Sequence, residues 1–122
     1  MTAKKVMVVD DSRMVHLQIA RLLADSGYEA AFFCQDGESA IETYRQEHPD
    51  LVTMDILMPG MDGLEAARAI LEEDTAARIV IVSSLAYDDT MEEAGQIGAR
   101  GFLYKPFDRE TLLAALDKAM ED

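Results

Sequence analysis

Near its N-terminus the chain reads Val6-Met7-Val8-Val9-Asp10-Asp11-Ser12. A run of four apolar residues without alternation is typical of a strand that is covered on both faces of a sheet. Ser12 favours the start of a helix, because its hydroxyl can accept a hydrogen bond from a backbone amide of the first turn. This stretch therefore predicts a strand–helix unit of a parallel α/β sheet, with two carboxylates between the strand and the helix.

The same unit recurs along the rest of the chain. Apolar runs of strand length alternate with longer stretches whose apolar residues have helical spacing, which predicts parallel strands joined by helices. Gly27 is expected to close the first helix, and the second helix must stop before Pro49. The predicted strands span 6–9, 30–33, 51–54, 79–82 and 101–104. The first predicted helix begins at Ser12, the second passes through Tyr44, the third follows Gly63, the fourth spans about 88–97 and the fifth begins at Asp108.

Five rounds of strand and helix predict one α/β domain over residues 1–122, a doubly wound parallel (βα)5 sheet. The length of 122 residues and the mass of 13.5 kDa suit a single domain. The sequence contains no linker, repeat or low-complexity segment.

The composition excludes several classes of protein. Asp and Glu number 24 against 11 Lys and Arg, and the net charge of −13 argues against direct nucleic-acid binding. The lone cysteine, Cys34, excludes an internal disulfide and a Cys/His zinc site, and it is predicted to be a small apolar side chain. No apolar run approaches the ~18 residues of a membrane span. We therefore expect a cytoplasmic protein that contacts neither membranes nor nucleic acid directly.

Polar side chains follow four of the predicted strands. Asp10 and Asp11 come after the first strand, Asp55 after the third, Ser83 after the fourth and Lys105 after the fifth. Each residue alone has an ordinary explanation as a strand end, a turn former or a surface charge. Ligands of open α/β sheets bind at the carboxyl ends of the strands, so the whole set predicts a binding site there.

The residue types of this set indicate phosphoryl transfer. Unpaired carboxylates that converge repel one another and need a cation, and a set of oxygen ligands without His or Cys favours Mg2+. Mg2+ commonly joins carboxylates to a phosphate, and Lys105 adds a second positive charge for phosphate oxygens. Asp55 is then the candidate nucleophile, and the Asp10 and Asp11 carboxylates are candidates to hold the metal.

At these positions the sequence closely resembles the receiver domain of two-component response regulators, in particular the single-domain chemotaxis type. The resemblance covers essentially the whole chain, and it implies a flavodoxin-like fold with the strand order 2-1-3-4-5. The motifs that carry it are Val8-Val9-Asp10-Asp11-Ser12, the run from Met54-Asp55 to Asp62-Gly63, the hydroxyl of Ser83, and Lys105-Pro106-Phe107.

The resemblance also implies roles at the phosphorylation site. Asp55 would accept a phosphoryl group from the phosphohistidine of a sensor histidine kinase or phosphotransfer domain. Asp11, Asp55 and the backbone carbonyl of Leu57 would bind Mg2+, and Asp10 would act mostly through water. The chain would turn over no external substrate, so we expect a signalling switch and not an enzyme. We expect a monomer that can dimerise on phosphorylation.

A second set of roles concerns the output. Lys105 would contact the phosphoryl group through a cis Lys105-Pro106 bond, the Ser83 hydroxyl would move toward it, and the Phe102 ring would change rotamer. A downstream protein target would read helix 88–97, strand 101–104 and the last helix. The chain departs from the usual pattern at three positions, with Ser83 where threonine is commoner, Ser84 where alanine is usual and Phe102 where tyrosine is frequent.

Hydrolysis of the phosphorylated aspartate is expected to be slow. Leu57 and Leu85 lie two residues after Asp55 and Ser83, where side chains flank the approach of water. Leucine cannot orient a water molecule by a hydrogen bond, and it shields the acyl phosphate from solvent.

Three other side chains are predicted to lie at the surface. His16 and His48 have no ligand-like neighbours in the sequence and are predicted to be surface polar groups. Met14 stands at the exposed start of the first helix, where together with Arg13 it can contact a phosphotransfer domain.

Three alternatives share the fold or the chemistry. A haloacid-dehalogenase-like phosphohydrolase also uses an aspartyl phosphate and Mg2+, but it needs a general-acid Asp where this chain has Leu57. A flavodoxin-like flavin carrier cradles a phosphate in its first loop, whereas Asp10 and Asp11 repel one. A pseudo-receiver binds partners without phosphorylation, which the complete set of chemical residues disfavours.

Overall fold

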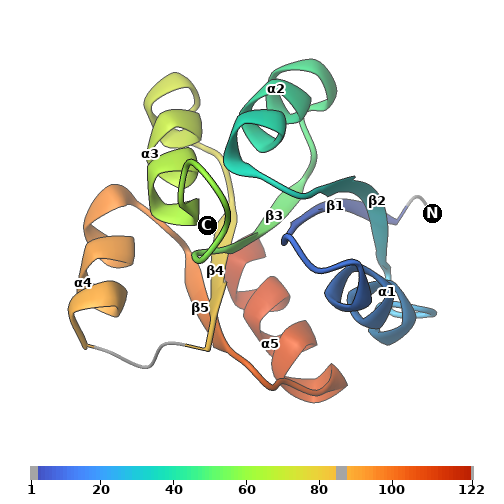
Figure 1. Ribbon diagram of the computed structural model, residues 1–122. Coiled ribbons are helices and arrows are strands. Elements are labelled where there is room, and N and C mark those ends of the chain that lie inside the picture. Colours follow the sequence, from blue (N-terminus) through green and yellow to red (C-terminus); the bar gives the residue numbers. More distant parts are fainter. Residues whose placement is uncertain (1–2, 85–87, 122) are drawn as a thin grey trace.

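The chain folds into a parallel five-stranded sheet between two layers of helices (Figure 1). The computed structural model describes residues 3–84 and 88–121. The strand order β2-β1-β3-β4-β5 confirms the (βα)5 fold and the order 2-1-3-4-5. The elements are β1 Lys4–Val9, α1 Arg13–Leu22, β2 Tyr28–Cys34, α2 Gly37–Glu47, β3 Leu51–Asp55, α3 Gly63–Glu73, β4 Ile79–Ser83, α4 Asp88–Ile97, β5 Gly101–Tyr104 and α5 Arg109–Met120.

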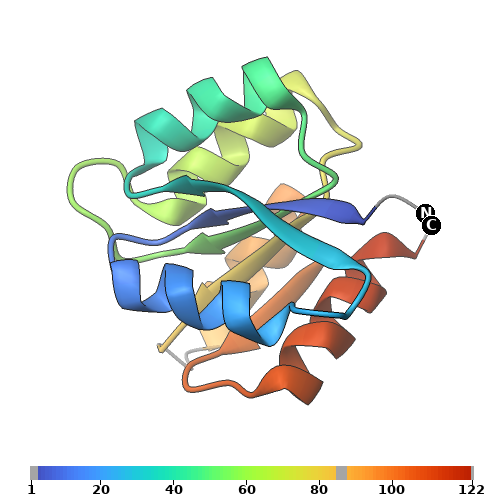
Figure 2. The same ribbon diagram turned by 90° about the vertical axis from the view of Figure 1, so that its right-hand side faces the viewer.

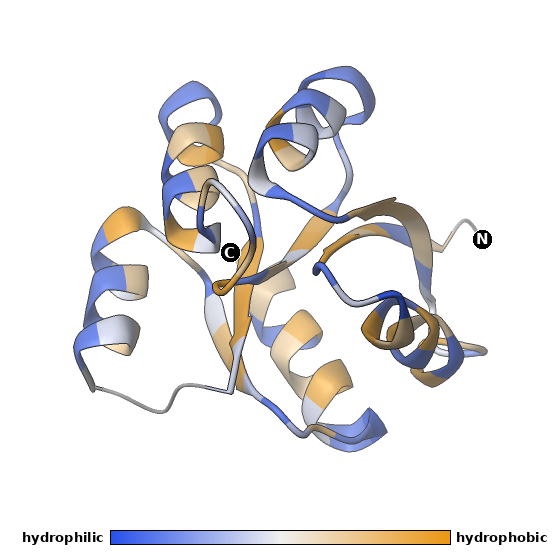
Figure 3. Cartoon of the chain, in the orientation of Figure 1, coloured by the Kyte–Doolittle hydropathy of each residue, from blue (hydrophilic) through white to orange (hydrophobic). Residues whose placement is uncertain are grey.

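Each face of the sheet carries its own hydrophobic core. Helices α1 and α5 cover one face and α2, α3 and α4 the other, as the two orthogonal views show (Figure 2). The central strands are mostly apolar, whereas the helices have one apolar side (Figure 3). Burial on both faces explains why β1, β3 and β4 have continuous rather than alternating apolar sequences.

The end of α1 differs from the prediction. The helix ends at Leu22, and Gly27 lies in the following turn with a φ of +88°. Arg109 from α5 donates hydrogen bonds to the Leu22 and Ala24 carbonyls, so contacts from elsewhere in the fold satisfy the helix end. Gly27 serves the turn into β2, where its positive φ is accessible without strain.

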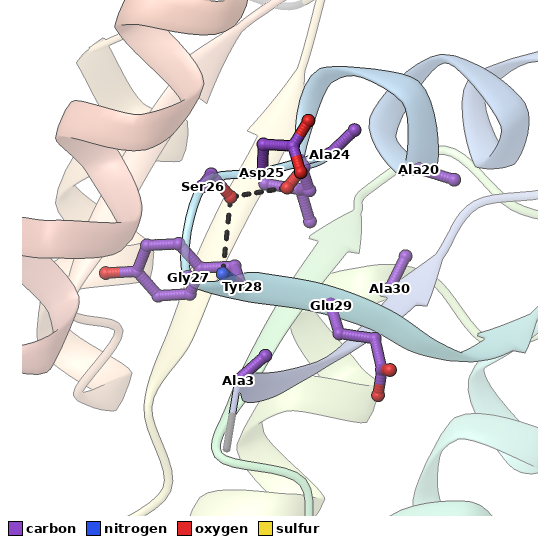
Figure 4. A pocket seen from close by; sticks show the side chains of 10 residues that line it. Ala3, Ala20, Ala24, Asp25, Ser26, Gly27, Tyr28, Glu29 and Ala30 are labelled. Atoms are coloured by element: carbon purple, nitrogen blue, oxygen red, sulfur yellow. Dashed lines mark hydrogen bonds between the residues drawn. The ribbon is translucent and has the colours of Figure 1, made fainter. Parts of the chain in front are cut away.

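That turn borders a hollow of about 410 Å³ at the amino ends of β1 and β2 (Figure 4). Ser26 donates to the Leu23 carbonyl and accepts from the amide of Tyr28, which fixes the turn. The lining combines small residues, among them Ala20 and Ala30, with the acidic side chains of Asp25 and Glu29. The hollow lies at the opposite end of the strands from the candidate site.

One polar side chain of the core has unsatisfied hydrogen-bonding capacity within the described residues. Thr53, in the middle of β3, is 1% exposed, and its hydroxyl has no hydrogen-bond partner in the described part of the chain. We expect Thr53→Val to raise the free energy of unfolding by about 1–2 kcal/mol, because it removes a buried hydroxyl and preserves the shape. Chemical denaturation measures this change. Thr111→Val is the matched control and should destabilise the protein, since the Thr111 hydroxyl bonds to Asp108 at the start of α5.

Candidate functional site

Three carboxylates meet at the carboxyl edge of the sheet. Asp55 is the last residue of β3, and Asp10 and Asp11 follow the neighbouring strand β1. One oxygen atom from each carboxylate lies within 4.8 Å of the others. Asp10 and Asp55 are buried, whereas Asp11 is exposed to solvent. The fold thus brings together the three acids that the sequence placed at strand ends.

The start of α1 fixes Asp10. Its carboxylate accepts a hydrogen bond of 2.9 Å from the backbone amide of Ser12. The Ser12 hydroxyl in turn accepts from the amide of Val15, as expected of the residue that caps the helix. The acidic pair therefore occupies a tight turn between strand and helix, and its two side chains differ in exposure.

Lys105 supplies the positive charge of the site. Its Nζ lies 2.8 Å from Asp10 Oδ2 and 3.4 Å from Asp55 Oδ1. The Lys105 amide also donates to the carbonyl of Ser83, which joins the ends of β4 and β5. The Lys105-Pro106 bond is cis, which confirms that prediction.

The charges of the site are not balanced by the protein itself. Burial, followed by the charge of Asp10, raises the pKa of Asp55 to about 6, although Lys105 acts in the opposite direction. Burial also disfavours the charged form of Lys105, but its bonds to Asp10 and Asp55 outweigh this effect and raise its pKa. One ammonium group among three carboxylates leaves a negative site. Its donors are all oxygen atoms, and this combination fits a hard divalent cation.

Gly63 is a site residue that was predicted only to precede a helix. Its amide donates a hydrogen bond of 2.9 Å to the carbonyl of Ile56, and a Cβ atom on it would lie 1.8 Å from the backbone oxygen of Asp55. The loop after β3 thus returns against the backbone of the candidate nucleophile. The Asp62-Gly63 pair at a helix start was the available signal, because a glycine there is consistent with a close backbone approach.

We expect Gly63→Ala to destabilise the protein by about 3 kcal/mol or more, because backbone atoms of Asp55 must move to admit the methyl group. Gly95→Ala is the control. Gly95 lies within α4 with open space around its Cα, so this change should stabilise the protein by about 1 kcal/mol. Thermal unfolding of both variants tests the pair, and equal effects would contradict the close approach.

The remaining predicted site residues lie around this cluster. Ser83 ends β4 and is 1% exposed, and Val82 beside it pairs with Asp55 in the sheet. Phe102 is partly exposed, with its ring centroid 5.0 Å from that of Tyr104. Leu57 is 58% exposed just beyond Asp55, and Leu85 lies outside the described residues.

The assignment of His16 to the surface is wrong. The side chain is buried, and its Nε2 atom lies 2.8 Å from the carbonyl oxygen of Asp10. The other assignments agree with the structure: His48 and Met14 are exposed, and Cys34 is buried. Within residues 3–84 and 88–121, every helix is too short or too polar to cross a membrane.

The comparison with known families agrees with this geometry. The family model described as "Response regulator receiver domain" matches residues 6–117. The chain belongs to this family, whose members are the phosphoaccepting switches of two-component signalling.

The most similar proteins include small chemotaxis regulators. The chain is 36% identical over 118 residues to the chemotaxis protein CheY of Bacillus subtilis, covering 97% of this chain and 98% of that one. It is 41% identical over 119 residues to the CheY of Treponema pallidum, covering 96% and 83%. Among solved structures, the CheX–CheY–BeF3–Mg2+ complex from Borrelia burgdorferi matches with a TM-score of 0.95 at 30% identity, covering 99% of this chain and 92% of that one.

Proposed function

We propose that the chain accepts a phosphoryl group on Asp55 in a Mg2+-dependent reaction with the phosphohistidine of a histidine kinase or phosphotransfer domain. The observation that carries the proposal is the buried Asp55 carboxylate, which lies between Lys105 and the acidic pair. Its pKa of about 6 leaves the carboxylate mostly ionised at neutral pH, as a nucleophile requires.

The side chains of the site have distinct tasks in this transfer. An Asp55 oxygen attacks the phosphorus, the phosphorus–nitrogen bond breaks, and the imidazole nitrogen keeps the bonding electron pair. An acyl phosphate remains on Asp55. Lys105 Nζ and the Ser83 hydroxyl contact the transferred oxygens and stabilise their charge.

Asp11, Asp55 and the Leu57 carbonyl would hold Mg2+, with Asp10 acting through water. The ion neutralises the negative charge of the carboxylates and of the incoming phosphoryl group. The oxygen-only donor set and the excess of negative charge support this part of the proposal.

The output face consists of α4, β5 and α5 in this proposal. Movement of the Ser83 hydroxyl toward the phosphoryl group leaves space that the Phe102 ring fills. The Tyr104 hydroxyl bonds to the sulfur of Met91, so β5 and α4 are tied together at the same face. A change at Phe102, which packs against the Tyr104 ring, can therefore reach α4.

The proposed partners are a histidine kinase or phosphotransfer domain and a downstream protein, in the cytoplasm and without direct nucleic-acid or membrane contact. The similarity to chemotaxis regulators supports a protein target, since the relative from Borrelia burgdorferi is found in complex with CheX. The chain would act as a monomer that can dimerise on phosphorylation, and it would turn over no external substrate.

Phosphorylation by a small donor tests the proposal directly. The purified protein is mixed with a phosphoramidate or an acyl phosphate, with Mg2+ or with a chelator, and its mass is measured. We expect the mass of one phosphoryl group to be gained only with Mg2+. Uptake in the presence of the chelator would contradict the metal's role, and no uptake under either condition would contradict the function.

The rate of dephosphorylation gives a separate prediction. Leu57→Asn should speed loss of the phosphoryl group several-fold, because an amide can orient the attacking water and leucine cannot. Leu17→Asn is the matched control, since both leucines are 58% exposed but Leu17 lies on α1. The decay of phosphorylated protein is followed after the donor is removed. Equal decay in the two variants would show that Leu57 does not shield the site.

A further inference from the structure

His16 joins the carboxyl ends of two strands. Its ring is 8% exposed on the inner side of α1, and Nε2 lies 2.8 Å from the carbonyl oxygen of Asp10 and 3.2 Å from that of Cys34. Both neighbours are acceptors, so Nε2 carries the hydrogen atom and donates to them. The ring also packs against Phe33, with centroids 5.3 Å apart. His16 is therefore held in place as a hydrogen-bond donor.

The carbonyl that His16 contacts is part of the peptide that leads into Asp11. The carboxylate of Asp10 is fixed by other groups, the amide of Ser12 and the Nζ of Lys105. The exposed Asp11 carboxylate has no hydrogen bond or ion pair with any other described residue. The direction of the Asp11 side chain is thus set by its own backbone, and the backbone is held by His16.

We infer that His16 is a positioning residue, which orients the Asp10–Asp11 peptide so that the Asp11 carboxylate faces the cation. This inference rests on the proposed function. Groups that orient metal ligands without touching the metal commonly change metal affinity by 10–100-fold when they are replaced. His16 has the geometry of such a group, because its Nε2 atom bonds to the backbone of the acidic pair and does not contact the carboxylates.

Two variants separate the hydrogen bond from the space that the ring fills. His16→Leu still fills much of the space of the ring but removes the donor, and His16→Gln places an amide N–H near the position of Nε2. We expect the Mg2+ dissociation constant, measured by calorimetry, to rise about tenfold in His16→Leu and to return close to the parent value in His16→Gln. Phosphorylation of His16→Leu by the small donor should recover at saturating Mg2+.

A measurement without metal supports the same test. Hydrogen exchange at the amide of Asp11 should be faster in metal-free His16→Leu than in the metal-free parent, because the peptide has lost its anchor. Ile19→Val is the control, since Ile19 is buried on the same helix without touching the site. Ile19→Val should lower the free energy of unfolding slightly and leave both the Mg2+ affinity and the rate of hydrogen exchange at the Asp11 amide unchanged. If His16→Leu fails to fold, His16→Asn replaces it, because its shorter side chain also loses the bond.

The outcomes are distinguishable. If the parent protein binds Mg2+ and the variants that lack the donor bind it with the same affinity, the positioning role alone is overturned. An equal loss of Mg2+ affinity in His16→Gln and His16→Leu also overturns the positioning role, because the ring would then act by packing. A parent protein that neither binds Mg2+ nor accepts a phosphoryl group overturns the proposed function, and this inference with it.

Discussion

Asp55→Asn is expected to abolish phosphorylation completely while the protein remains folded. The amide has the shape of the carboxylate but lacks the ionised oxygen that attacks phosphorus. Asp55 is the buried acid closest to Lys105 after Asp10, and its position at the end of β3 places it at the centre of the sheet edge. Mass spectrometry after incubation with the donor and Mg2+ measures the loss.

Two controls make this result specific. Asp10→Asn should retain phosphorylation at Asp55, although at a reduced rate, because the neighbouring acid has a supporting role. Ser83→Ala should likewise be modified. Labelling of Asp55→Asn at the parent level would transfer the acceptor role to Asp10, Asp11 or Ser83, and peptide mapping would identify which.

Mg2+ should stabilise the fold strongly. Ligands that bind only the native state add about 2.7 kcal/mol to the free energy of unfolding at a hundredfold excess over the dissociation constant. We expect this gain in the parent protein, and we expect most of it to disappear in Asp11→Ala, which lacks the exposed carboxylate of the cluster. Melting curves with and without Mg2+ measure the effect. An unchanged melting temperature in the parent would contradict the metal site.

The pH dependence of this stabilisation follows from Asp55. Its pKa is raised in the folded state, from 3.8 to about 6, so the folded protein binds this proton more tightly than the unfolded chain does. Without metal, Asp55 favours folding below about pH 4, and this contribution is lost as the pH rises through 6. Two pKa units correspond to about 3 kcal/mol. The gain from Mg2+ should therefore be largest above pH 6 and should shrink as Asp55 is protonated.

The sequence was sufficient to predict the strands and the acidic cluster. Continuous apolar runs are conspicuous in sequence, and parallel strands bring their carboxyl ends to one edge whatever the helices between them do. The order of the strands along the chain therefore predicts that Asp10, Asp55 and Lys105 lie together. The end of α1 was missed, because Arg109, far along the chain, satisfies its last carbonyls.

The positions of His16 and Gly63 depend on neighbours that the sequence does not specify. His16 precedes Ile19 by three residues and Leu23 by seven, so helical spacing indicates the buried side of α1, and the assignment of His16 to the surface overlooked this signal. A polar residue on such a face indicates a buried hydrogen bond, but its carbonyl partners on two strands are fixed only by the fold. The need for glycine at position 63 arises from an approach of backbone to backbone, which leaves no pattern of side chains.

The site draws its groups from segments far apart in the chain, since the bond between Lys105 and Asp10 spans 95 residues. Such contacts form only after the loops between them have closed, at a cost in chain entropy. An unfolded or half-folded chain therefore has no phosphate acceptor site, even though it contains every residue of it. The extent of phosphorylation would then depend on the fraction of molecules that are folded. A kinase would not phosphorylate unfolded chains, which cannot transmit the signal. Destabilised variants would lose signalling in proportion to their unfolded fraction.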